Sequence, residues 1–209
     1  MSALREKRAD ATRKAILAAA LTLFLRKGYH ATAVREIAEA AGIVPGAVYN
    51  HFAGKEDLYQ ALLLDTNMYT VLAEALSAAT GDSAEALLRD AAHRIVASLE
   101  ARSEIIPLVM VDVLEFEGRN VRHLAAQTLP VMVRFFSAVT ASGTQQGELR
   151  PMRPDVLGRA FLGLFVSYSI TGRVFAPAAG DIPDLAMSAD LVDQFLDIFA
   201  HGVLRQGHG

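Results

Sequence analysis

Residues 32–59 read TAVREIAEAAGIVPGAVYNHFAGKEDLY, and this stretch decides the fold around it. Its apolar residues recur at helical spacing in two short segments, which are separated by Gly42 where the chain needs a left-handed residue. The second segment opens with Pro45, which is tolerated at a first helical position because its missing N–H has no partner there. A third helix begins at Lys55. The pattern predicts a helix-turn-helix with a supporting helix behind it.

One further helix precedes this motif and ends at Gly28, a left-handed stop. Asp10 or Thr12 is expected to cap its start. Thr32 is expected to cap the helix over residues 34–41, because Ala33 offers no side-chain acceptor. The first helix has an apolar face at helical spacing, formed by Ile16, Leu17, Ala20, Leu23 and Phe24.

The second helix of such a motif is the one that enters the DNA major groove. Helical spacing turns Val48 and Phe52 inward and leaves a mostly small, weakly polar outward face. The outward residues are Pro45, Gly46, Ala47, Tyr49 and Asn50. The small residues let the backbone approach the groove, and the methyl of Ala47 suits a thymine methyl.

Polar groups near this helix suggest how it would hold DNA. Tyr49, His51 and Lys55 are predicted to reach phosphate oxygens, with the dipole of the following helix adding to the attraction at Lys55. Asn50 and Arg35 have the strongest base-reading groups, so much of the sequence preference is expected to come from DNA shape. The alternative is an aromatic core cluster of Tyr49, His51 and Phe52, which we favour for Phe52 only.

Charge is distributed unevenly along the 209 residues, of which 52% are apolar. The net charge of −3 argues at first against a nucleic-acid partner. Residues 1–60, however, hold nine Lys or Arg against six Asp or Glu, a balance of +3, whereas the remainder holds eleven Arg against seventeen acids, a balance of −6. A basic head on an acidic body is expected when one end of a protein meets phosphate.

The sequence lacks the motifs that are typical of secreted proteins, membrane proteins and several classes of enzyme. There is no cysteine, which excludes disulfides and thiol catalysis and agrees with a cytoplasmic location. The charged N-terminus is not a secretory signal and the apolar runs are short for a bilayer span, so no membrane partner is predicted. No phosphate loop, dinucleotide glycine pattern or serine elbow appears, so neither catalysis nor a cofactor is predicted. Asp90 and His93 share a helix face, but without a second such pair no metal is predicted.

Beyond residue 60 the pattern stays helical, without a strand signal. We predict an all-α fold of about nine helices, with a helix-turn-helix DNA-binding domain over residues 1–55 and a ligand-binding and dimerisation domain over residues 56–209. One continuous helix is expected over about residues 55–78, and a loop rich in Ala, Gly and Pro over residues 175–183.

The N-terminal sequence resembles the DNA-binding domain of the TetR/AcrR family of one-component transcription repressors, over roughly residues 11–60. Three motifs support the resemblance: F-x-x-x-G-Y at residues 24–29, I-A-x-x-A-G at residues 37–42 and Y-x-H-F-x-x-K-E at residues 49–56. The resemblance implies a dimer that places two recognition helices in successive major grooves of a palindromic operator. It implies base or phosphate contacts from Thr32, Arg35, Pro45, Gly46, Ala47, Tyr49, His51 and Lys55.

Two positions depart from the family pattern. Val44 stands where the family usually has the Ser or Thr that caps the recognition helix, and this loss should cost about 1 kcal/mol. Ala33 also replaces a frequent Ser or Thr. Both departures are expected to lower DNA affinity rather than to abolish DNA binding.

Small residues in the C-terminal part predict a dimer surface. Ala160, Gly163 and Ser167 recur at three- and four-residue steps, which lets helices approach closely. Phe195 and Phe199 lie along one side of the last helix, and two such helix pairs would form a four-helix bundle. The alternative is that these faces pack within one chain.

An effector cavity is expected in the apolar body, because such pockets are mostly apolar with a few fixed polar groups. Its predicted lining is His93, Met110, Phe116, His123, Phe135 and Tyr168. For the apolar members a role in the core is an equal alternative, whereas an imidazole among Ala and Leu needs a partner. The predicted effector is a small, mostly apolar or aromatic compound.

We hypothesise a homodimeric repressor that a small apolar effector releases from a palindromic operator. The effector would move the helix that begins at Lys55 and so change the separation of the heads, which must match about 34 Å of DNA. The alternatives are an activator or a ligand-requiring corepressor with the same head, a helical metal-dependent enzyme, and a ligand-sequestering protein that has lost DNA binding.

Overall fold

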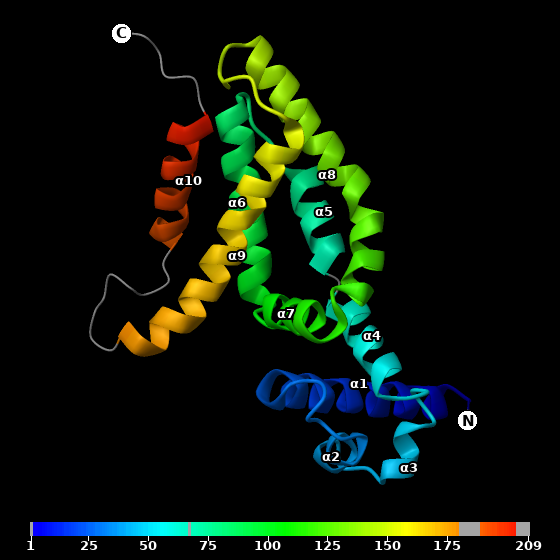
Figure 1. Ribbon diagram of the computed structural model, residues 1–209. Coiled ribbons are helices and arrows are strands. Elements are labelled where there is room, and N and C mark those ends of the chain that lie inside the picture. Colours follow the sequence, from blue (N-terminus) through cyan, green and yellow to red (C-terminus); the bar gives the residue numbers. More distant parts are fainter. Residues whose placement is uncertain (1, 67, 180–188, 204–209) are drawn as a thin grey trace. The chain divides into compact units, whose positions relative to one another are not determined.

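The computed structural model describes residues 2–66, 68–179 and 189–203, and every regular element in these ranges is a helix (Figure 1). The predicted all-α fold is therefore confirmed. The helices are α1 (Ser2–Lys27), α2 (Val34–Ala40), α3 (Pro45–Val48), α4 (Lys55–Thr66), α5 (Met68–Ala78), α6 (Ala84–Ala101), α7 (Ile105–Phe116), α8 (Arg119–Gln145), α9 (Pro154–Ala179) and α10 (Ala189–Val203).

Three details of the expected helix pattern need correction. The helix predicted over residues 55–78 is described as two, α4 and α5, on either side of Asn67, which is not described. Residues 175–179 of the predicted loop belong to α9, where alanine's helix propensity extends the helix. Residues 180–183 of that loop lie outside the described residues.

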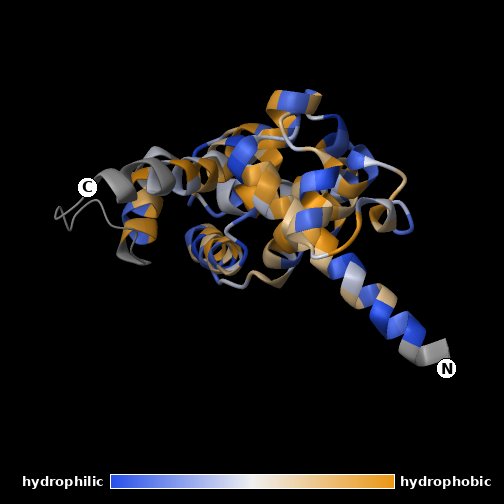
Figure 2. Cartoon of the chain, turned by 90° about the horizontal axis from the view of Figure 1, so that it is seen from below, coloured by the Kyte–Doolittle hydropathy of each residue, from blue (hydrophilic) through white to orange (hydrophobic). Residues whose placement is uncertain are grey.

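The start of α1 is the third correction. The helix begins at Ser2, so Asp10 and Thr12 lie inside it rather than at its cap. Asp10 pairs with Lys14 at 2.8 Å, and the Thr12 hydroxyl donates to the Arg8 carbonyl at 2.9 Å. Residues 5–11 are exposed, and the coloured part of this end of α1 is mostly hydrophilic (Figure 2). Helix-favouring charged residues with i,i+4 pairing therefore extend the helix beyond its apolar face.

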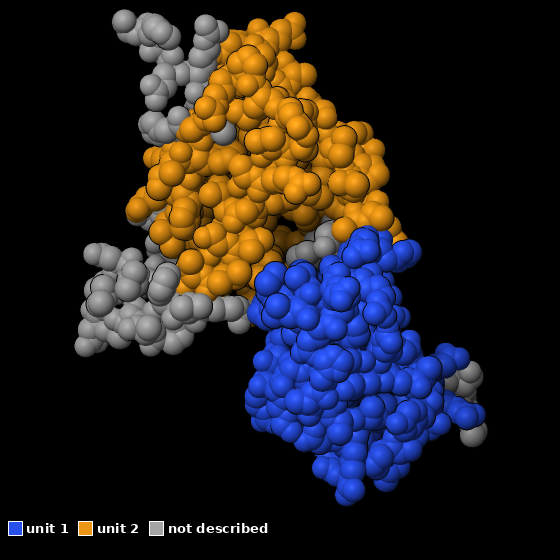
Figure 3. Space-filling view, viewed as in Figure 1, with its two compact units in different colours: residues 1–68, 107–124 blue, residues 69–106, 125–209 orange. Residues whose placement is uncertain are grey.

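The chain divides into two compact units, shown in Figure 3. Unit 1 contains Met1–Met68 and Pro107–Leu124, so it holds α1 to α4 together with most of α7 and the start of α8. Unit 2 contains Tyr69–Ile106 and Ala125–Gly209. The unit that holds the helix-turn-helix is thus larger than the predicted domain of residues 1–55, because it recruits a segment distant in sequence.

The predicted turns and core faces of the helix-turn-helix are confirmed. Gly28 and Gly42 have φ of +86° and +71°, the left-handed conformation that glycine adopts without steric cost. α1 packs against α2 and α4, and α2 packs against α3. The buried residues include those predicted above from helical spacing, namely Ile16, Leu17, Ala20, Leu23, Phe24, Val48 and Phe52, and also Ile37 and Ala38 of α2.

An aromatic cluster forms the centre of unit 1 and joins α1, α4 and α7. The Tyr29 ring lies 5.3 Å from Phe24, 5.5 Å from Tyr59 and 4.5 Å from Phe116. The Tyr59 and Phe116 rings stack at 4.9 Å. All four side chains are buried, so α7 is part of the same core as the helix-turn-helix.

Unit 2 has a core of its own, to which α5, α6, α8, α9 and α10 contribute. Rings of α8, α9 and α10 pack edge to face or tilted, with Phe161 5.7 Å from Phe136, 5.1 Å from Phe165 and 5.8 Å from Phe199. Gly158 allows this packing, because a Cβ there would come within 2.9 Å of the Phe136 ring.

The sequence analysis expected every apolar run to be too short to span a bilayer, and α8 differs from this expectation. In the described part of the chain it alone is long and apolar enough, by length and composition, to cross a membrane. This is weak evidence, because core helices of water-soluble proteins pass the same test.

Candidate nucleic-acid interface and effector cavity

The outward face of α3 is exposed, and small side chains make up much of it. Its cap residue Val44 makes no side-chain hydrogen bond and is 71% exposed, and Tyr49 just after the helix is 59% exposed. Pro45, Gly46 and Asn50 are also exposed, and a Cβ added at Gly46 would meet nothing within 4 Å. A surface of this kind can approach the base edges of a major groove closely.

The backbone fixes α3 on the preceding helix. The Ile43 N–H donates to the Ala38 carbonyl at 3.0 Å, which closes the turn around Gly42. Val48 and Phe52 then anchor α3 in the core of unit 1. Ala47 and His51 are half-buried at the edge of the outward face.

Arg35 on α2 is exposed and pairs with Glu39 one turn later, at 2.9 Å. Exposed i,i+4 pairs are weak, roughly 0.3–0.5 kcal/mol, so this arginine can exchange its partner for a phosphate or a base. Its predicted DNA contact is thus compatible with its position.

Thr32 does not cap α2, and that prediction is wrong. The cap residue is Ala33, whose N–H donates to Glu36 Oε2 at 3.0 Å. This bond and the ion pair with Lys27 hold the pKa of the Glu36 carboxyl below its ordinary value. The Thr32 side chain is buried, and its hydroxyl donates to the Gly28 carbonyl at 2.8 Å. The hydroxyl therefore stabilises the turn and is not presented to DNA.

Lys55, which was predicted to be a phosphate ligand, has hydrogen-bond partners within the protein. Its ammonium donates to the carbonyl oxygens of Tyr29 at 2.8 Å, Thr32 at 2.9 Å and His30 at 3.3 Å. It also lies 4.3 Å from the centre of the Tyr29 ring. Because an ammonium has three hydrogens, these acceptors use all of them. The acceptors lie 23 to 26 residues away in sequence, which is why local spacing did not reveal them.

Glu115 on α7 is a residue that the sequence analysis missed. Its two carboxylate oxygens accept the backbone N–H groups of Tyr29 at 2.9 Å and His30 at 2.8 Å. The one available signal was a pair of acids, Asp112 and Glu115, within the apolar segment IIPLVMVDVLEF. Asp112 is fully buried and accepts from Asn120 Nδ2 at 2.8 Å and from the Val121 N–H at 3.0 Å.

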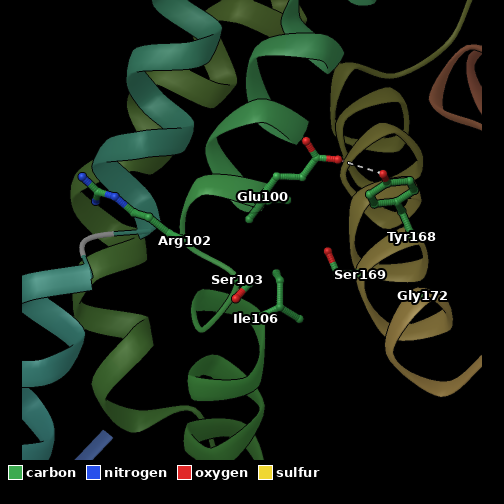
Figure 4. A pocket seen from close by; sticks show the side chains of 8 residues that line it. Glu100, Arg102, Ser103, Ile106, Tyr168, Ser169 and Gly172 are labelled. Carbon is green, nitrogen blue, oxygen red and sulfur yellow. Dashed lines mark hydrogen bonds between the residues drawn. The ribbon is translucent and has the colours of Figure 1, made fainter. Parts of the chain in front are cut away.

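A cavity of about 290 Å³ lies in unit 2, between the α6–α7 junction and α9 (Figure 4). Its lining is Leu99, Glu100, Arg102, Ser103, Ile106, Tyr168, Ser169 and Gly172. Glu100 and Tyr168 face each other, and the Tyr168 hydroxyl donates to Glu100 Oε1 at 3.1 Å. Burial, with help from this bond, raises the pKa of Tyr168 to about 12. The phenol therefore stays a neutral donor at physiological pH.

The predicted effector residues divide between the two units, with Met110, Phe116 and His123 in unit 1 and His93, Phe135 and Tyr168 in unit 2. Tyr168 lines the cavity, and Phe135 packs against Phe136 with ring centres 5.1 Å apart. Phe116 belongs to the aromatic cluster of unit 1, and Met110 is half-buried in the same unit. His123 is exposed.

His93 is exposed as well, and its Nε2 lies 3.1 Å from Asp193 on α10. Asp90, one turn earlier, accepts from Arg94 and from the Thr80 N–H, both at 2.8 Å. Among the described residues, no group of three or more His, Asp or Glu side chains is arranged to hold a metal ion.

The predicted dimer residues divide into two sets. Ala160, Gly163 and Ser167 of α9 are exposed. Phe195 is half-buried and lines a second, much smaller cavity of about 10 Å³, while Phe199 packs on Phe161. The α9 stripe is thus free at the surface of a single chain, whereas the two phenylalanines contribute to its core.

Comparison with known proteins identifies the fold and the class. The chain matches the family described as bacterial regulatory proteins, tetR family, over residues 16–62. It is 31% identical over 192 residues to the HTH-type transcriptional regulator AcrR of Shigella flexneri, a match that covers 87% of each chain.

Two solved structures are similar over nearly the whole chain. NalD, the secondary repressor of the MexAB-OprM multidrug efflux pump in Pseudomonas aeruginosa, is 27% identical with a TM-score of 0.64, covering 95% of this chain and 99% of that one. KstR2 of Mycobacterium tuberculosis, a ketosteroid transcriptional regulator, has a TM-score of 0.71 at 20% identity over 93% and 95% of the chains, which shows a shared fold. Together with the helix-turn-helix geometry, these matches establish that the chain belongs to the TetR family of bacterial transcriptional regulators.

Proposed function

We propose that the protein is a homodimeric repressor that binds a palindromic operator and is released when a small molecule occupies the cavity beside Tyr168. The observation that supports it most is the outward face of α3. This face combines an exposed Tyr49 with an unobstructed Gly46, on a helix that the core of unit 1 holds in place.

DNA contact would come from the exposed polar groups of α2 and α3. Arg35, Tyr49 and Asn50 are exposed, and their groups suit phosphate oxygens or base edges. Lys55 is assigned an indirect role, because its hydrogens are used within the protein. Thr32 is assigned a structural role, because its hydroxyl donates to the Gly28 carbonyl within the protein.

The dimer would form on the exposed stripe of α9. The small residues Ala160, Gly163 and Ser167 lie among exposed apolar side chains, of which Val156 and Ile170 continue the same three- and four-residue spacing. A face that is both apolar and unobstructed at Gly163 suits close packing against a second copy. Substitution Gly163→Arg should convert the dimer to a monomer in sedimentation velocity, whereas Ala138→Arg on an exposed α8 position should not.

The effector is proposed to be more polar than the sequence suggested. The cavity presents the Glu100 carboxylate, the Tyr168 hydroxyl and two serines beside Leu99 and Ile106. Pockets with a few fixed polar groups on an apolar wall select compounds of mixed character. A small, partly apolar compound with hydrogen-bonding groups fits this lining.

The sign of regulation is proposed from relatives. NalD is described as a repressor, and so is KstR2 of Rhodococcus jostii, to which this chain is 47% identical over 51 residues, 24% of its length. A repressor acts where the chromosome lies, so the proposed location is the bacterial cytoplasm.

The test is to select operators from a random duplex library and to measure affinity by fluorescence anisotropy at two salt concentrations. The selected sequences should be palindromic, with half-sites about 34 Å apart. The pair of substitutions Arg35→Ala and Tyr49→Ala should lower the affinity by at least tenfold, because each removes contacts of about 1–3 kcal/mol. Arg153→Ala, which removes an exposed charge of unit 2, should leave it unchanged. Transcription in vitro from a promoter that overlaps the operator should fall when the protein binds, and a rise would overturn the repressor assignment.

A further inference from the structure

The positive charge of residues 1–60 lies before the helix-turn-helix rather than in it. Residues 15–60 hold four Lys or Arg and four Asp or Glu, so their formal charges cancel. Residues 1–14 hold five Lys or Arg and two Asp or Glu, which accounts for the whole balance of +3. Attraction to phosphate supplies much of the affinity of a protein for DNA. The beginning of α1 is therefore the segment of unit 1 that is best charged to provide it.

The cations of the helix-turn-helix have partners within unit 1. Lys27 pairs with Glu36. Arg35 pairs with Glu39 at 2.9 Å. The Lys55 ammonium binds three backbone carbonyls. A phosphate has to compete with these partners, so the helix-turn-helix is poorly equipped to hold the DNA backbone by charge alone.

Three arginines share one side of the beginning of α1. An α-helix turns by about 100° per residue, so Arg5, Arg8 and Arg13 fall within about 140° of its circumference. We call these three residues the arginine face. The two acids of the segment, Glu6 and Asp10, fall beyond the Arg13 edge of that sector. The arginine face therefore presents positive charge alone.

The arginine face continues the buried side of α1. Ile16, Ala20 and Leu23 occupy the same sector in the following turns, and they are buried in unit 1, where α1 packs on α2 and α4. Residues 5–11, in contrast, are exposed. The arginine face thus points to the side of α1 on which the helix-turn-helix lies, beyond the end of the shared core.

Arg13 brings this face next to the end of α3. Its guanidinium carbon lies 5.3 Å from the centre of the Phe52 ring, which follows the last residue of α3 by four positions. Phe52 is buried and anchors α3 in the core. The face of the ring attracts the cation, while the N–H groups of a guanidinium point outward in its own plane. The contact keeps the beginning of α1 beside the helix that meets DNA.

The dimensions suit a contact with several phosphates. Arg5 and Arg13 are separated by about 12 Å along the helix axis, at about 1.5 Å per residue. Successive phosphates of one DNA strand are about 3.4 Å apart along the duplex axis. Surface guanidinium groups bind phosphate oxygens in a bidentate manner. The arginine face is therefore long enough to reach phosphates that α3 does not reach.

We propose that the arginine face is a second DNA-binding site, which binds the phosphate backbone beside each operator half-site. The inference rests on the proposed function and adds to it a contact outside α2 and α3. Arg5 and Arg8 bind phosphate oxygens and read no base. The contact therefore raises the affinity for operator and for other DNA by the same factor.

The first experiment compares two double variants of the full chain. The arginine double variant is Arg5→Gln with Arg8→Gln, and the lysine double variant is Lys7→Gln with Lys14→Gln. Each removes two positive charges from the same turns, and glutamine has a helix propensity close to that of Arg and Lys. Only the first pair belongs to the arginine face, because Lys7 and Lys14 lie on the opposite side of the helix. All four side chains are exposed, so thermal unfolding should be alike in the two variants.

Operator affinity is measured by fluorescence anisotropy over a series of salt concentrations. In the arginine double variant the slope of log affinity against log salt should decrease by about 1.8 for each bound subunit, since each phosphate contact contributes about 0.9. Its affinity at about 0.1 M salt should fall at least tenfold, for operator and non-operator DNA alike. The lysine double variant should show less than half of this change in slope, because its charges act only through screened attraction.

The second experiment varies the DNA instead of the protein. One operator duplex ends at its half-sites, and another extends about five base pairs, or about 17 Å, beyond each of them. This length matches the distance of about 17 Å from Ile16 to Arg5 along α1. The wild-type protein should bind the extended duplex at least tenfold more tightly, whereas the arginine double variant should bind both duplexes alike, within about twofold.

The outcomes separate the two proposals. A wild-type protein without operator affinity would overturn the proposed function, and this inference with it. Wild-type operator binding that the two double variants weaken equally, with equal salt slopes, would overturn the arginine face alone. So would a wild-type preference for the extended duplex that the arginine double variant retains. A loss of affinity for operator without an equal loss for other DNA would show that these arginines read bases and do not bind phosphate.

Discussion

The Tyr59 hydroxyl donates a 2.7 Å hydrogen bond to the Leu108 carbonyl, and both residues are fully buried. Burial raises the pKa of Tyr59, so the hydroxyl remains a donor throughout the physiological range. Tyr59→Phe should lower the free energy of unfolding by about 1–2 kcal/mol, because a buried carbonyl loses its partner. Urea denaturation measures this. Tyr49→Phe is the matched control, since Tyr49 is exposed. The free energy of unfolding of this variant should stay within about 0.5 kcal/mol of the wild-type value, while its operator affinity falls.

Gly46→Ala should separate DNA binding from stability. A Cβ at Gly46 meets nothing within 4 Å and its φ is not positive, so the free protein should be as stable or slightly more stable. In the major groove the added methyl would hold the backbone away from the bases and lower operator affinity about tenfold. Gly54→Ala, equally unobstructed but outside α3, should bind like wild type. If Gly46→Ala bound the operator as tightly as wild type does, α3 would not approach the groove closely.

Val44→Ser should restore the missing cap of α3. A serine oxygen can accept a first-turn N–H, so thermal and urea unfolding should show a gain of about 0.5–1 kcal/mol. Val113→Ser, which changes another exposed valine away from any helix start, should give no gain. If both serine variants behave alike, the four-residue helix is not limited by its cap.

Arg89 should contribute more to stability than Arg94 on the same helix. Arg89 bonds Asp193 at 3.1 Å and Asp197 at 3.0 Å, which joins α6 to α10, and it also bonds Glu85. Within the described residues, the partner of Arg94 is Asp90, one turn away on the same helix. Arg89→Met should therefore destabilise by about 1 kcal/mol and Arg94→Met by less than about 0.5 kcal/mol. The difference should shrink at high salt, which screens exposed charges.

The Asp90 carboxyl should make a pH-dependent contribution to the free energy of unfolding. Its bond from Arg94, and then that from the Thr80 N–H, hold its pKa below the ordinary value near 3.8. A carboxyl with a lowered pKa in the folded state stabilises above its unfolded pKa, and the contribution disappears as the pH falls through the folded pKa. Asp90→Asn should therefore be less stable than wild type at pH 7, and the difference should be smaller at pH 2. Urea midpoints at the two pH values measure it, and a constant difference would contradict the ionic origin.

The helix-turn-helix was predictable because its determinants are local. The apolar faces around Phe24 and Phe52, the left-handed turns at Gly28 and Gly42 and the proline at the start of α3 follow from helical spacing and backbone sterics. The outward face of α3 also follows from helical spacing, and the charge asymmetry follows from the distribution of Lys, Arg, Asp and Glu along the sequence. The same locality failed at Thr32, where the cap rule ignored that a turn can bury the hydroxyl.

The partners of charged side chains needed the tertiary structure. Lys55 binds carbonyls 23 to 26 residues away, Glu115 binds N–H groups 85 and 86 residues away, and His93 meets Asp193 across 100 residues. A charged group can pair with any opposite charge or dipole that the fold brings within reach, so spacing cannot choose among them. The sequence by itself determined the helix-turn-helix, its buried faces and the family. Only the tertiary structure decided that α7 joins the DNA-binding unit and that the cavity beside Tyr168 has a polar wall, because both depend on packing between segments distant in the chain.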